Sequence, residues 1–328
     1  MKPRKPEVSI IVLTYNQPDT IGRTLDSILA QQCNFPYEII ISDDSTDSAT
    51  RNAIEPYVKA FPSVVRLLPK HPQFGVVRNY FHALAHCRGE MIADCAGDDY
   101  WYGFDGLQQK RDILMAHPDA AFVHSDWLLR NVRCYDCTLT PSDATGWRQQ
   151  YRHHYDSGDK LLPVALSANG GPLIHLSTVL YRKAIIDEAL AVNPSIVERV
   201  EWGSEDLPVI AALLASNRAV CWLPKATLVY SVGGNTITSP QLLASAARYY
   251  AASAIMVMQL AEHYHVPAKA VAKAINAKTH YAMSQAILSR DKALIAELQA
   301  LFASHKIRRP ILDRLKESIK SLLLRFKR

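Results

Sequence analysis

The residues best suited to chemistry in this 328-residue chain are two adjacent carboxylates, Asp98 and Asp99. They follow residues 90–93, a short apolar segment typical of a strand, and the aromatic pair Tyr100–Trp101 comes directly after them. Carboxylates at a strand end are oxygen ligands of the kind that Mg2+ or Mn2+ prefers, and such a cation can hold a diphosphate. We expect a divalent metal site here; the alternative is an ordinary solvated turn.

The first element that would position these acids is a strand over residues 8–13, a β-branched apolar run that ends in a turn at 14–16. A helix is expected next, capped by Thr20 and continuing to about Gln31. Its apolar residues recur at helical spacing and would form one buried stripe: Ile21, Leu25, Ile28 and Leu29.

A second apolar strand, residues 37–41, runs into an acidic turn that would cap a helix over 48–61. Strands and helices that alternate in this way predict a parallel sheet with right-handed crossovers. Ligands of such sheets bind beyond the carboxyl ends of the strands. We therefore expect Asn16, Asp44 and Asp98 to converge at one edge of the sheet.

Four motifs follow one another in the first third of the chain: Val-Ser-Ile-Ile-Val-Leu-Thr-Tyr-Asn at 8–16, Glu-Ile-Ile-Ile-Ser-Asp-Asp-Ser-Thr-Asp at 38–47, Gly-Val-Val-Arg-Asn at 75–79 and Gly-Asp-Asp-Tyr-Trp at 97–101. In order and spacing they resemble the family 2 glycosyltransferases. The resemblance implies an α/β fold, with a GT-A type nucleotide-binding domain, a mostly parallel central sheet and a C-terminal helical region after it.

The likeness is close over residues 6–130 and looser over 170–237, where Ser177–Arg182, Gly203–Asp206 and Tyr230 resemble the acceptor-side half of the family. It implies transfer of a sugar, with inversion at the anomeric carbon, from a nucleoside-diphosphate donor. A UDP-sugar is the first candidate for that donor. The implied acceptor is a hydroxyl of a cell-surface polysaccharide, a lipopolysaccharide or another lipid-linked glycan. Nothing beyond about residue 240 resembles the family.

The resemblance also implies roles for single residues of the donor half. Asp44 would contact the base, Arg78 would approach the nucleotide, and Asp99, helped by Asp98, would hold the metal. The nucleotide pocket as a whole would be formed by Thr14, Tyr15, Asn16, Asp43, Asp44, Arg78, Asn79 and Asp98.

On the acceptor side, Asp206 of the pair Glu205–Asp206 matches the general base of the family. A hydroxyl must lose its proton as it attacks the anomeric carbon, and a positioned carboxylate can accept that proton. The same residues also fit a helix start, because Ser204 can cap and acids are favoured in the first turn. Both interpretations can hold together.

Three departures separate the chain from the family pattern. Ala96 stands where many members have an acid, the acidic turn after the second strand is one residue shorter, and Gly233 stands where a late metal or phosphate ligand is common. These departures keep open a non-catalytic sugar-nucleotide or carbohydrate-binding protein. A nucleotidyltransferase is a weaker alternative, because no glycine-rich basic loop follows the first strand.

Composition is that of a globular protein, with 48% hydrophobic and 21% charged residues. No run is long enough to cross a bilayer, and six scattered cysteines suit a reducing cytoplasm. Cys134 and Cys137 have the spacing of one half of a zinc site, and His153 and His154 follow them. Ordinary reduced thiols are nevertheless favoured. His175 is interpreted as a structural histidine.

The domain boundaries expected from sequence are a catalytic domain at 1–238, a helical appendage at 239–305 and a basic amphipathic helix at 306–328. Within the first, residues 146–171 are expected to form a mobile loop beside the acceptor cleft. In the appendage, helices are expected to begin at Ser239–Pro240, after Val266–Pro267 and near Arg290.

The last segment, 306–328, has nine Lys or Arg residues and two acids, a net charge of +7 in a chain whose total is +6. Its apolar residues fall on one helical face, and a basic amphipathic helix can lie on an anionic membrane surface. The chain would then be cytoplasmic and peripheral on the inner membrane. Packing on the protein, or contact with a second copy, is the alternative. Nucleic acid is disfavoured, because the rest of the chain has no basic face, and the sequence leaves the oligomeric state open.

Overall fold

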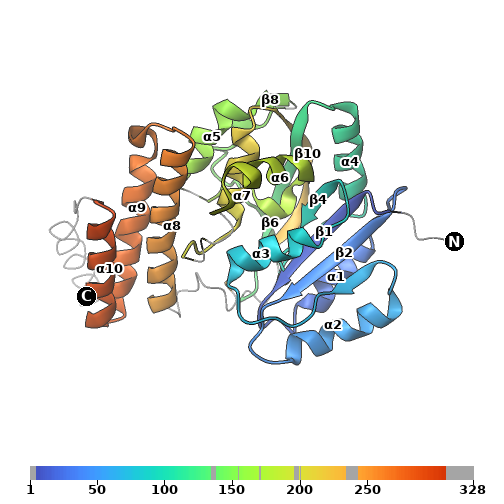
Figure 1. Cartoon of the computed structure of the whole chain (residues 1–328), viewed down its shortest axis with the longest axis horizontal. Helices are drawn as coiled ribbons and strands as arrows, with labels where there is room; N and C mark the ends of the chain where they lie inside the picture. The colour runs from blue at the N-terminus through green and yellow to red at the C-terminus, as the bar shows by residue number, and fades with distance from the viewer. Residues whose placement is uncertain are drawn as a thin grey trace. The chain divides into compact units, whose positions relative to one another are not determined.

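A computed structural model of the chain describes residues 5–133, 138–153, 155–169, 171–195, 199, 201–233 and 243–307 (Figure 1). It divides into two compact units. The first comprises Met1–Ala165, Gly171–Val200 and Ser204–Gly234, and the second comprises Leu166–Gly170, Glu201–Gly203 and Asn235–Arg328. All the candidate site residues belong to the first unit. The predicted boundaries after residues 238 and 305 stay predictions, and the first lies outside the described residues.

The amino-terminal half of the sheet is parallel. Its strands lie in the order β3-β2-β1-β4, with bounds Val65–Leu67, Tyr37–Asp43, Val8–Thr14 and Met91–Asp94. Every residue of β1 is buried, because a parallel strand covered by helices needs apolar side chains on both faces. The predicted strands are confirmed, and the carboxyl ends of β1, β2 and β4 lie at one edge.

Three crossover helices connect these strands: α1 at Ile21–Leu29, α2 at Ala49–Ala60 and α3 at Val76–Ala85. Helices α1 and α2 contact each other, whereas α3 packs on β1 and β2. Right-handed crossovers place α1 and α2 on one face of the sheet and α3 on the other (Figure 1). The predicted apolar stripe of α1 is confirmed, since Ile21, Leu25 and Ile28 are fully buried.

The predicted cap of α1 is wrong in its chemistry, whereas the acidic turn before α2 supplies a cap through Asp47, as predicted. The Thr20 hydroxyl donates to the Gly97 carbonyl at 2.8 Å and makes no cap bond to α1. Ser48 precedes α2 without a side-chain cap bond, and the Asp47 carboxylate accepts the Ala49 N–H at 2.9 Å. In α1 the hydroxyl therefore connects the helix start to the turn that carries Asp98.

The other half of the sheet is mixed and continues in the order β9-β6-β10-β5. These strands are Leu180–Arg182, Ala120–Asn131, Ala219–Val232 and Tyr100–Trp101, while β7 (Leu139–Pro141) pairs with β6 and β8 (Tyr155–Ser157) pairs with β10. Strands β6 and β10 are parallel to each other. Strand β10 also pairs antiparallel with the two-residue strand β5, which lies directly after Asp99.

Helices α4 (Gly106–Ala116), α6 (Lys183–Val192) and α7 (Asp206–Ala215) complete this half. The mobile loop predicted over 146–171 is wrong, because that segment contains the 3-10 helix η1 (Gln149–Tyr151), strand β8 and helix α5 (Gly158–Ser167). Helix α5 forms because Leu161, Leu162 and Ala165 fall on one helical face and are buried.

The second unit contains three helices among its described residues: α8 at Leu243–His263, α9 at Ala268–Leu288 and α10 at Lys292–Ser304. Alanines of α8 and α9 meet larger side chains of α10 in one core that includes Ala251, Ala282 and Leu298. The predicted helices are confirmed, although the predicted start at Ser239–Pro240 lies outside the described residues. The predicted amphipathic helix lies outside them as well, apart from Lys306 and Ile307.

None of the helices that the structure describes combines the length and apolar character needed to cross a membrane. The described cysteines, Cys33, Cys87, Cys95 and Cys221, are free thiols. The proposed zinc ligands Cys134, Cys137 and His154 lie outside the described residues.

Candidate active site

The turn from Cys95 to Asp99 continues β4 along the edge of β1. The Cys95 and Gly97 N–H groups donate to the carbonyls of Ile11 and Leu13, and the Asp99 N–H closes a turn onto the Ala96 carbonyl. A Cβ atom on Gly97 would lie 2.5 Å from Gln17 Oε1 and 2.9 Å from Thr14. Only glycine therefore lets this turn approach the turn after β1.

Asp99 is fully buried at the centre of the site. Its Oδ1 accepts the Ser231 N–H at 2.8 Å, and its Oδ2 is buried without a hydrogen-bond partner. Burial raises the pKa of Asp99 well above its usual range, and the nearby Asp98 carboxylate raises it further. An orphaned carboxylate oxygen is costly in a dry site unless a cation binds it.

The main chain at Asp98 is held from two sides. Its carbonyl accepts the Ser231 hydroxyl at 2.7 Å and the Arg23 guanidinium at 2.9 Å. Arg23 lies over the Tyr100 ring, and its Nε is buried without a partner. Burial lowers the pKa of Arg23, as does the charge of Arg130. The Arg23 guanidinium therefore lies beside the acid pair, and the sequence predicted no role for it.

The two aspartates fit a divalent cation. The described residues contain no cluster of three or more His, Cys, Asp or Glu side chains that could hold a metal ion alone. Mg2+ and Mn2+ commonly take one or two protein carboxylates and complete their shell with phosphate oxygens and water. Asp99 Oδ2, which lacks a partner, and the half-buried Asp98 carboxylate supply such a pair of ligands.

The turn after β1 contains three predicted pocket residues, Thr14, Tyr15 and Asn16. Thr14 is buried and donates to Gln17 Oε1, whereas Tyr15 is 50% exposed. Asn16 has a left-handed φ of 54°, which asparagine tolerates. Its N–H donates to Ser45 Oγ at 2.8 Å, and its side-chain oxygen accepts the Thr46 N–H. Asn16 thus connects the turns after β1 and β2.

The predicted pocket residues after β2 differ in their surroundings. Asp43 accepts hydrogen bonds from Ser45 and lies 3.8 Å from Arg51. Asp44 accepts the N–H groups of Phe74 and Gly75, each at 2.9 Å. Asp44 therefore fixes the loop that leads into α3.

The two pocket residues predicted at the start of α3 point in different directions. Arg78 is exposed, as a nucleotide contact requires. Asn79 is buried, and both of its amide atoms bond to Ser42. Asn79 is thus engaged in fastening α3 to β2, and a contact with nucleotide would require it to change partners.

The predicted base lies at the first residue of α7. The Asp206 N–H donates to Ser204 Oγ at 3.2 Å, so the predicted helix start is confirmed, and the role of Asp206 as the base stays a prediction. Burial raises the pKa of Asp206 and of Glu205, and the neighbouring Asp206 charge raises that of Glu205 further. His175 lowers the pKa of Asp206, which makes it the more readily ionised acid of the two.

His175 is buried beside this pair and belongs to the site. Its Nδ1 accepts the Ser177 N–H at 3.3 Å, and its ring lies 5.5 Å from that of Trp127 and 4.9 Å from that of Tyr230. Burial lowers the pKa of His175, whereas the Asp206 charge raises it. The interpretation as a purely structural histidine misses this electrostatic contact.

Asp94, the last residue of β4, is a buried acid that the sequence reasoning missed. The Ser177 hydroxyl donates to it at 2.8 Å. Burial, and then the Asp206 charge, raise the pKa of Asp94 to about 7. Its charge also acts on Glu205 and Asp99, which places it electrostatically between the metal pair and the base. The available signal was an acid at the end of a short apolar strand.

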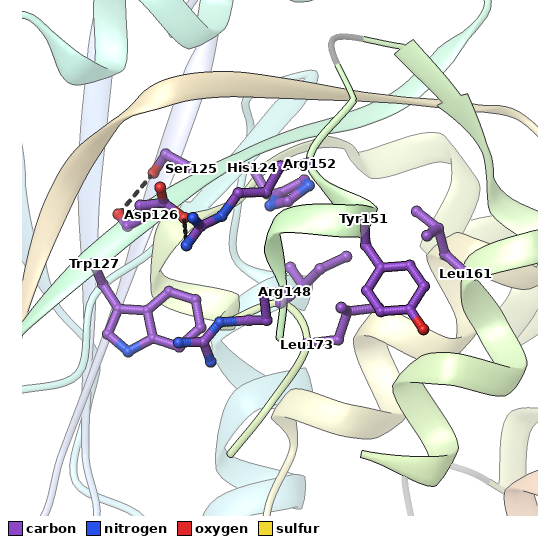
Figure 2. A pocket seen from close by; sticks show the side chains of 10 residues that line it. His124, Ser125, Asp126, Trp127, Arg148, Tyr151, Arg152, Leu161 and Leu173 are labelled. Atoms are coloured by element: carbon purple, nitrogen blue, oxygen red, sulfur yellow. Dashed lines mark hydrogen bonds and ion pairs between the residues drawn. The ribbon is translucent and has the colours of Figure 1, made fainter. Parts of the chain in front are cut away.

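A small pocket is lined by Trp127 on one side (Figure 2). The Trp127 ring lies 5.5 Å from that of His175. The Arg148 guanidinium lies 4.1 Å from the centre of the Trp127 ring, and Arg152 pairs with Asp126 at 2.8 Å. Its other walls come from η1, α5 and residues 173–174. The pocket thus combines aromatic and paired charged groups, surfaces that suit a polar ligand with an apolar face.

Comparison with known proteins finds a likeness to glycosyltransferases over part of the chain. Residues 9–110 match the family model "Glycosyl transferase family 2". An uncharacterised protein of Mycobacterium tuberculosis is 37% identical over 112 residues, which are 34% of this chain and 32% of that protein. A Bacillus subtilis glycosyltransferase named for teichuronic acid biosynthesis, TuaG, is 33% identical over 112 residues, 34% of this chain and 43% of its own.

The matched segment thus spans about a third of the length of the first of these relatives. Among solved structures, the mannosyltransferase PcManGT from Pyrobaculum calidifontis, in complex with GDP-Man and Mn2+, has a TM-score of 0.52 at 16% identity. The alignment covers 93% of this chain and 82% of that one. The likeness confirms the predicted GT-A fold.

The buried acids predict an unusual dependence of stability on pH. Asp94 has a pKa of about 7 in the folded chain and about 4 in an unfolded one. Between these values the folded chain binds more protons, so the free energy of unfolding falls as pH rises. In metal-free protein, Asp94→Asn should be more stable than wild type by about 2–4 kcal/mol at pH 8, with little difference at pH 4.

Urea unfolding at the two pH values measures this difference, with the exposed carboxylate variant Asp19→Asn as the control. A stability gain that is equal at pH 4 and pH 8, or absent at both, would show that Asp94 is not a destabilising buried charge.

Proposed function

Because residues 9–110 match glycosyltransferase family 2, we propose that the chain transfers a sugar from a nucleoside-diphosphate donor to an acceptor hydroxyl, with inversion at the anomeric carbon. The observation that carries the proposal is the buried Asp99 carboxylate, which keeps one oxygen without a partner beside Asp98. A UDP-sugar is the donor we propose first. The acceptor we propose is a cell-surface polysaccharide, a lipopolysaccharide or another lipid-linked glycan.

On the donor side, Asp98 and Asp99 would hold Mg2+ or Mn2+. That cation would neutralise the charge that develops on the departing diphosphate. Arg23 supports the same role, because its guanidinium is fixed at the Asp98 carbonyl and retains an N–H without a partner. Tyr15 and Arg78, both exposed, are free to contact the nucleotide, while Asp44 would accept a hydrogen bond from the base.

On the acceptor side, Asp206 would remove the proton of the attacking hydroxyl. Its place at the first turn of α7 and its contact with His175 favour the carboxylate form, which a base requires. Burial opposes that form, so the proton affinity of Asp206 is higher than that of an exposed aspartate. A carboxylate with raised affinity is a better base at neutral pH.

The Trp127 ring and the charged groups of Arg148 and Arg152 lie on the His175 side of the site and support a polar, sugar-like acceptor. The Bacillus subtilis relative is named for teichuronic acid biosynthesis, which supports a cell-surface polysaccharide as acceptor. Gly233 need not reflect a lost ligand. Its φ is +84°, and a Cβ there would lie 2.8 Å from Asn131 Oδ1, so the backbone requires glycine.

The net charge of +7 on residues 306–328 supports attachment to the cytoplasmic face of an anionic membrane, where lipid-linked acceptors are found.

Asp99→Asn should abolish metal-dependent turnover. Asparagine can still accept the Ser231 N–H but lacks the anionic second oxygen, so we expect a fall of about a hundredfold or more in donor turnover with Mn2+. The assay measures nucleoside diphosphate released from UDP-, GDP- and dTDP-sugars. Asp112→Asn, an exposed carboxylate of α4, is the control. Turnover by Asp99→Asn at the control rate would rule out this metal site.

Asp206→Asn should spare donor binding and reduce turnover by about 10²–10⁴-fold, because the amide cannot accept a proton. The wild-type rate should fall as pH drops through the raised pKa of Asp206, since the protonated acid is not a base. Nucleotide affinity and nucleoside diphosphate release, with water or an added glycan as acceptor, are measured on both proteins. An unchanged rate in Asp206→Asn would show that the base is another group.

Removal of the residues after Arg309 should weaken sedimentation with liposomes that contain anionic lipids, because most of the basic charge of 306–328 is lost. Donor turnover should be unchanged, and neutral liposomes are the control. Equal sedimentation of the full and shortened chains would favour packing of this segment on protein.

A further inference from the structure

His71 lies in the loop between β3 and α3, and its side chain is 8% exposed. Its ring stacks on that of Phe74, with the ring centres 4.0 Å apart. Around the ring lie Ser42 and Asp44 from the end of β2 and His82 from α3. The proposed function has no role for this histidine.

The hydrogen bonds around Ser42 show which residue, Ser42 or His71, is the donor in the contact between them. The Asn79 Nδ2 group donates to the Ser42 carbonyl at 3.2 Å, so Asn79 Oδ1 must face the Ser42 hydroxyl. That hydroxyl donates its single proton to Asn79 Oδ1 at 2.6 Å. Ser42 Oγ, which lies 3.3 Å from His71 Nε2, is then left to accept, and His71 Nε2 must donate.

The other ring nitrogen also faces acceptors. His71 Nδ1 lies 2.8 Å from the Pro72 carbonyl and 3.6 Å from Asp44 Oδ1. A carbonyl and a carboxylate can only accept, so Nδ1 must carry a proton too. A histidine with protons on both nitrogens is an imidazolium ion. The pattern of donors and acceptors is therefore complete only when His71 is positively charged.

We propose that His71, in its imidazolium form, is a positioning residue of the nucleotide site, and that nucleotide binds most tightly to the protein in which His71 is protonated. The charge pairs with Asp44, whose two oxygens hold the Phe74 and Gly75 N–H groups. Loss of the proton removes this ion pair and leaves one ring nitrogen facing its acceptor, Ser42 Oγ or the Pro72 carbonyl, without a hydrogen between them. This inference rests on the proposed function, in which Asp44 contacts the base.

The groups that surround His71 do not supply the same pH response. Burial lowers the pKa of His82, and the charges of His86 and His71 lower it further, so protonation of His82 is disfavoured. From α2, Arg51 contacts Asp43 and the Leu68 carbonyl and keeps its charge over the whole range. Asp44 is the one carboxylate that the described structure pairs with His71.

The test combines NMR spectroscopy with affinity measurement on the full chain. Long-range 1H–15N spectra of histidine-labelled protein report protonation at each ring nitrogen, and amide spectra follow Phe74 and Gly75, all as a function of pH. The Kd of UDP with Mn2+ is measured by calorimetry between about pH 5.5 and pH 8.5 for wild type, His71→Gln and His280→Gln. His280, in α9 of the second unit, is the matched control.

We expect the Phe74 and Gly75 amides to shift with the titration of His71, and saturation with UDP to hold His71 in its doubly protonated form to higher pH. Wild type and His280→Gln should lose about three- to tenfold in affinity relative to His71→Gln as pH rises, which is the effect of one ordinary hydrogen bond. A parallel pH profile for His71→Gln and wild type, or a His71 titration unmoved by UDP, would overturn the proposal.

The amide spectra are recorded without ligand. They therefore test the role of His71 separately from the proposed donor site. If no form of the protein binds UDP, the proposed donor site fails on that result. Phe74 and Gly75 amides that do not follow His71 in the free protein would overturn the positioning role by themselves.

Discussion

The hydrogen bond from the Ser231 N–H to Asp99 is the contact on which the arrangement of the site depends. It joins the turn after β4 to strand β10, 132 residues later in the chain, and fixes the acid pair between them. The Ser231 hydroxyl and Arg23 hold the Asp98 carbonyl in addition. One oxygen of a buried carboxylate thereby stays available, at a cost in stability that a bound cation would remove.

The free-energy cost of burying an ionised carboxylate recurs across the site. Asp94, Asp99, Glu205 and Asp206 are acids whose pKa values are all raised, first by burial. Only His175 among their described neighbours partly offsets this for Asp206. Such a concentration of acids disfavours the folded state at neutral pH, and it is typical of catalytic sites rather than of structural ion pairs. On the nucleotide side, Asp44 is instead satisfied by backbone N–H groups and His71.

Much of this could be predicted from sequence because it is local. The buried runs at β1 and β2, the stripe of α1 and the pair Asp98–Asp99 depend on residues within a few positions of one another. The long-range partners could not be predicted in this way: Ser231 reaches Asp99 only through the pairing of β10, and Thr20 binds Gly97 instead of capping α1. Asp94 was missed because an acid in a short apolar strand is indistinguishable, by pattern, from a strand end.

The measurement that tests the account most directly is calorimetric titration of UDP, GDP and dTDP into the purified chain, each with and without Mn2+. We predict that one nucleoside diphosphate binds and that its affinity depends on the metal. The reason is that Asp99 Oδ2 needs a cation, and the diphosphate would complete the coordination shell of that cation. Absence of binding by all three, with and without Mn2+, would contradict it and favour a protein that retains the fold without the donor site.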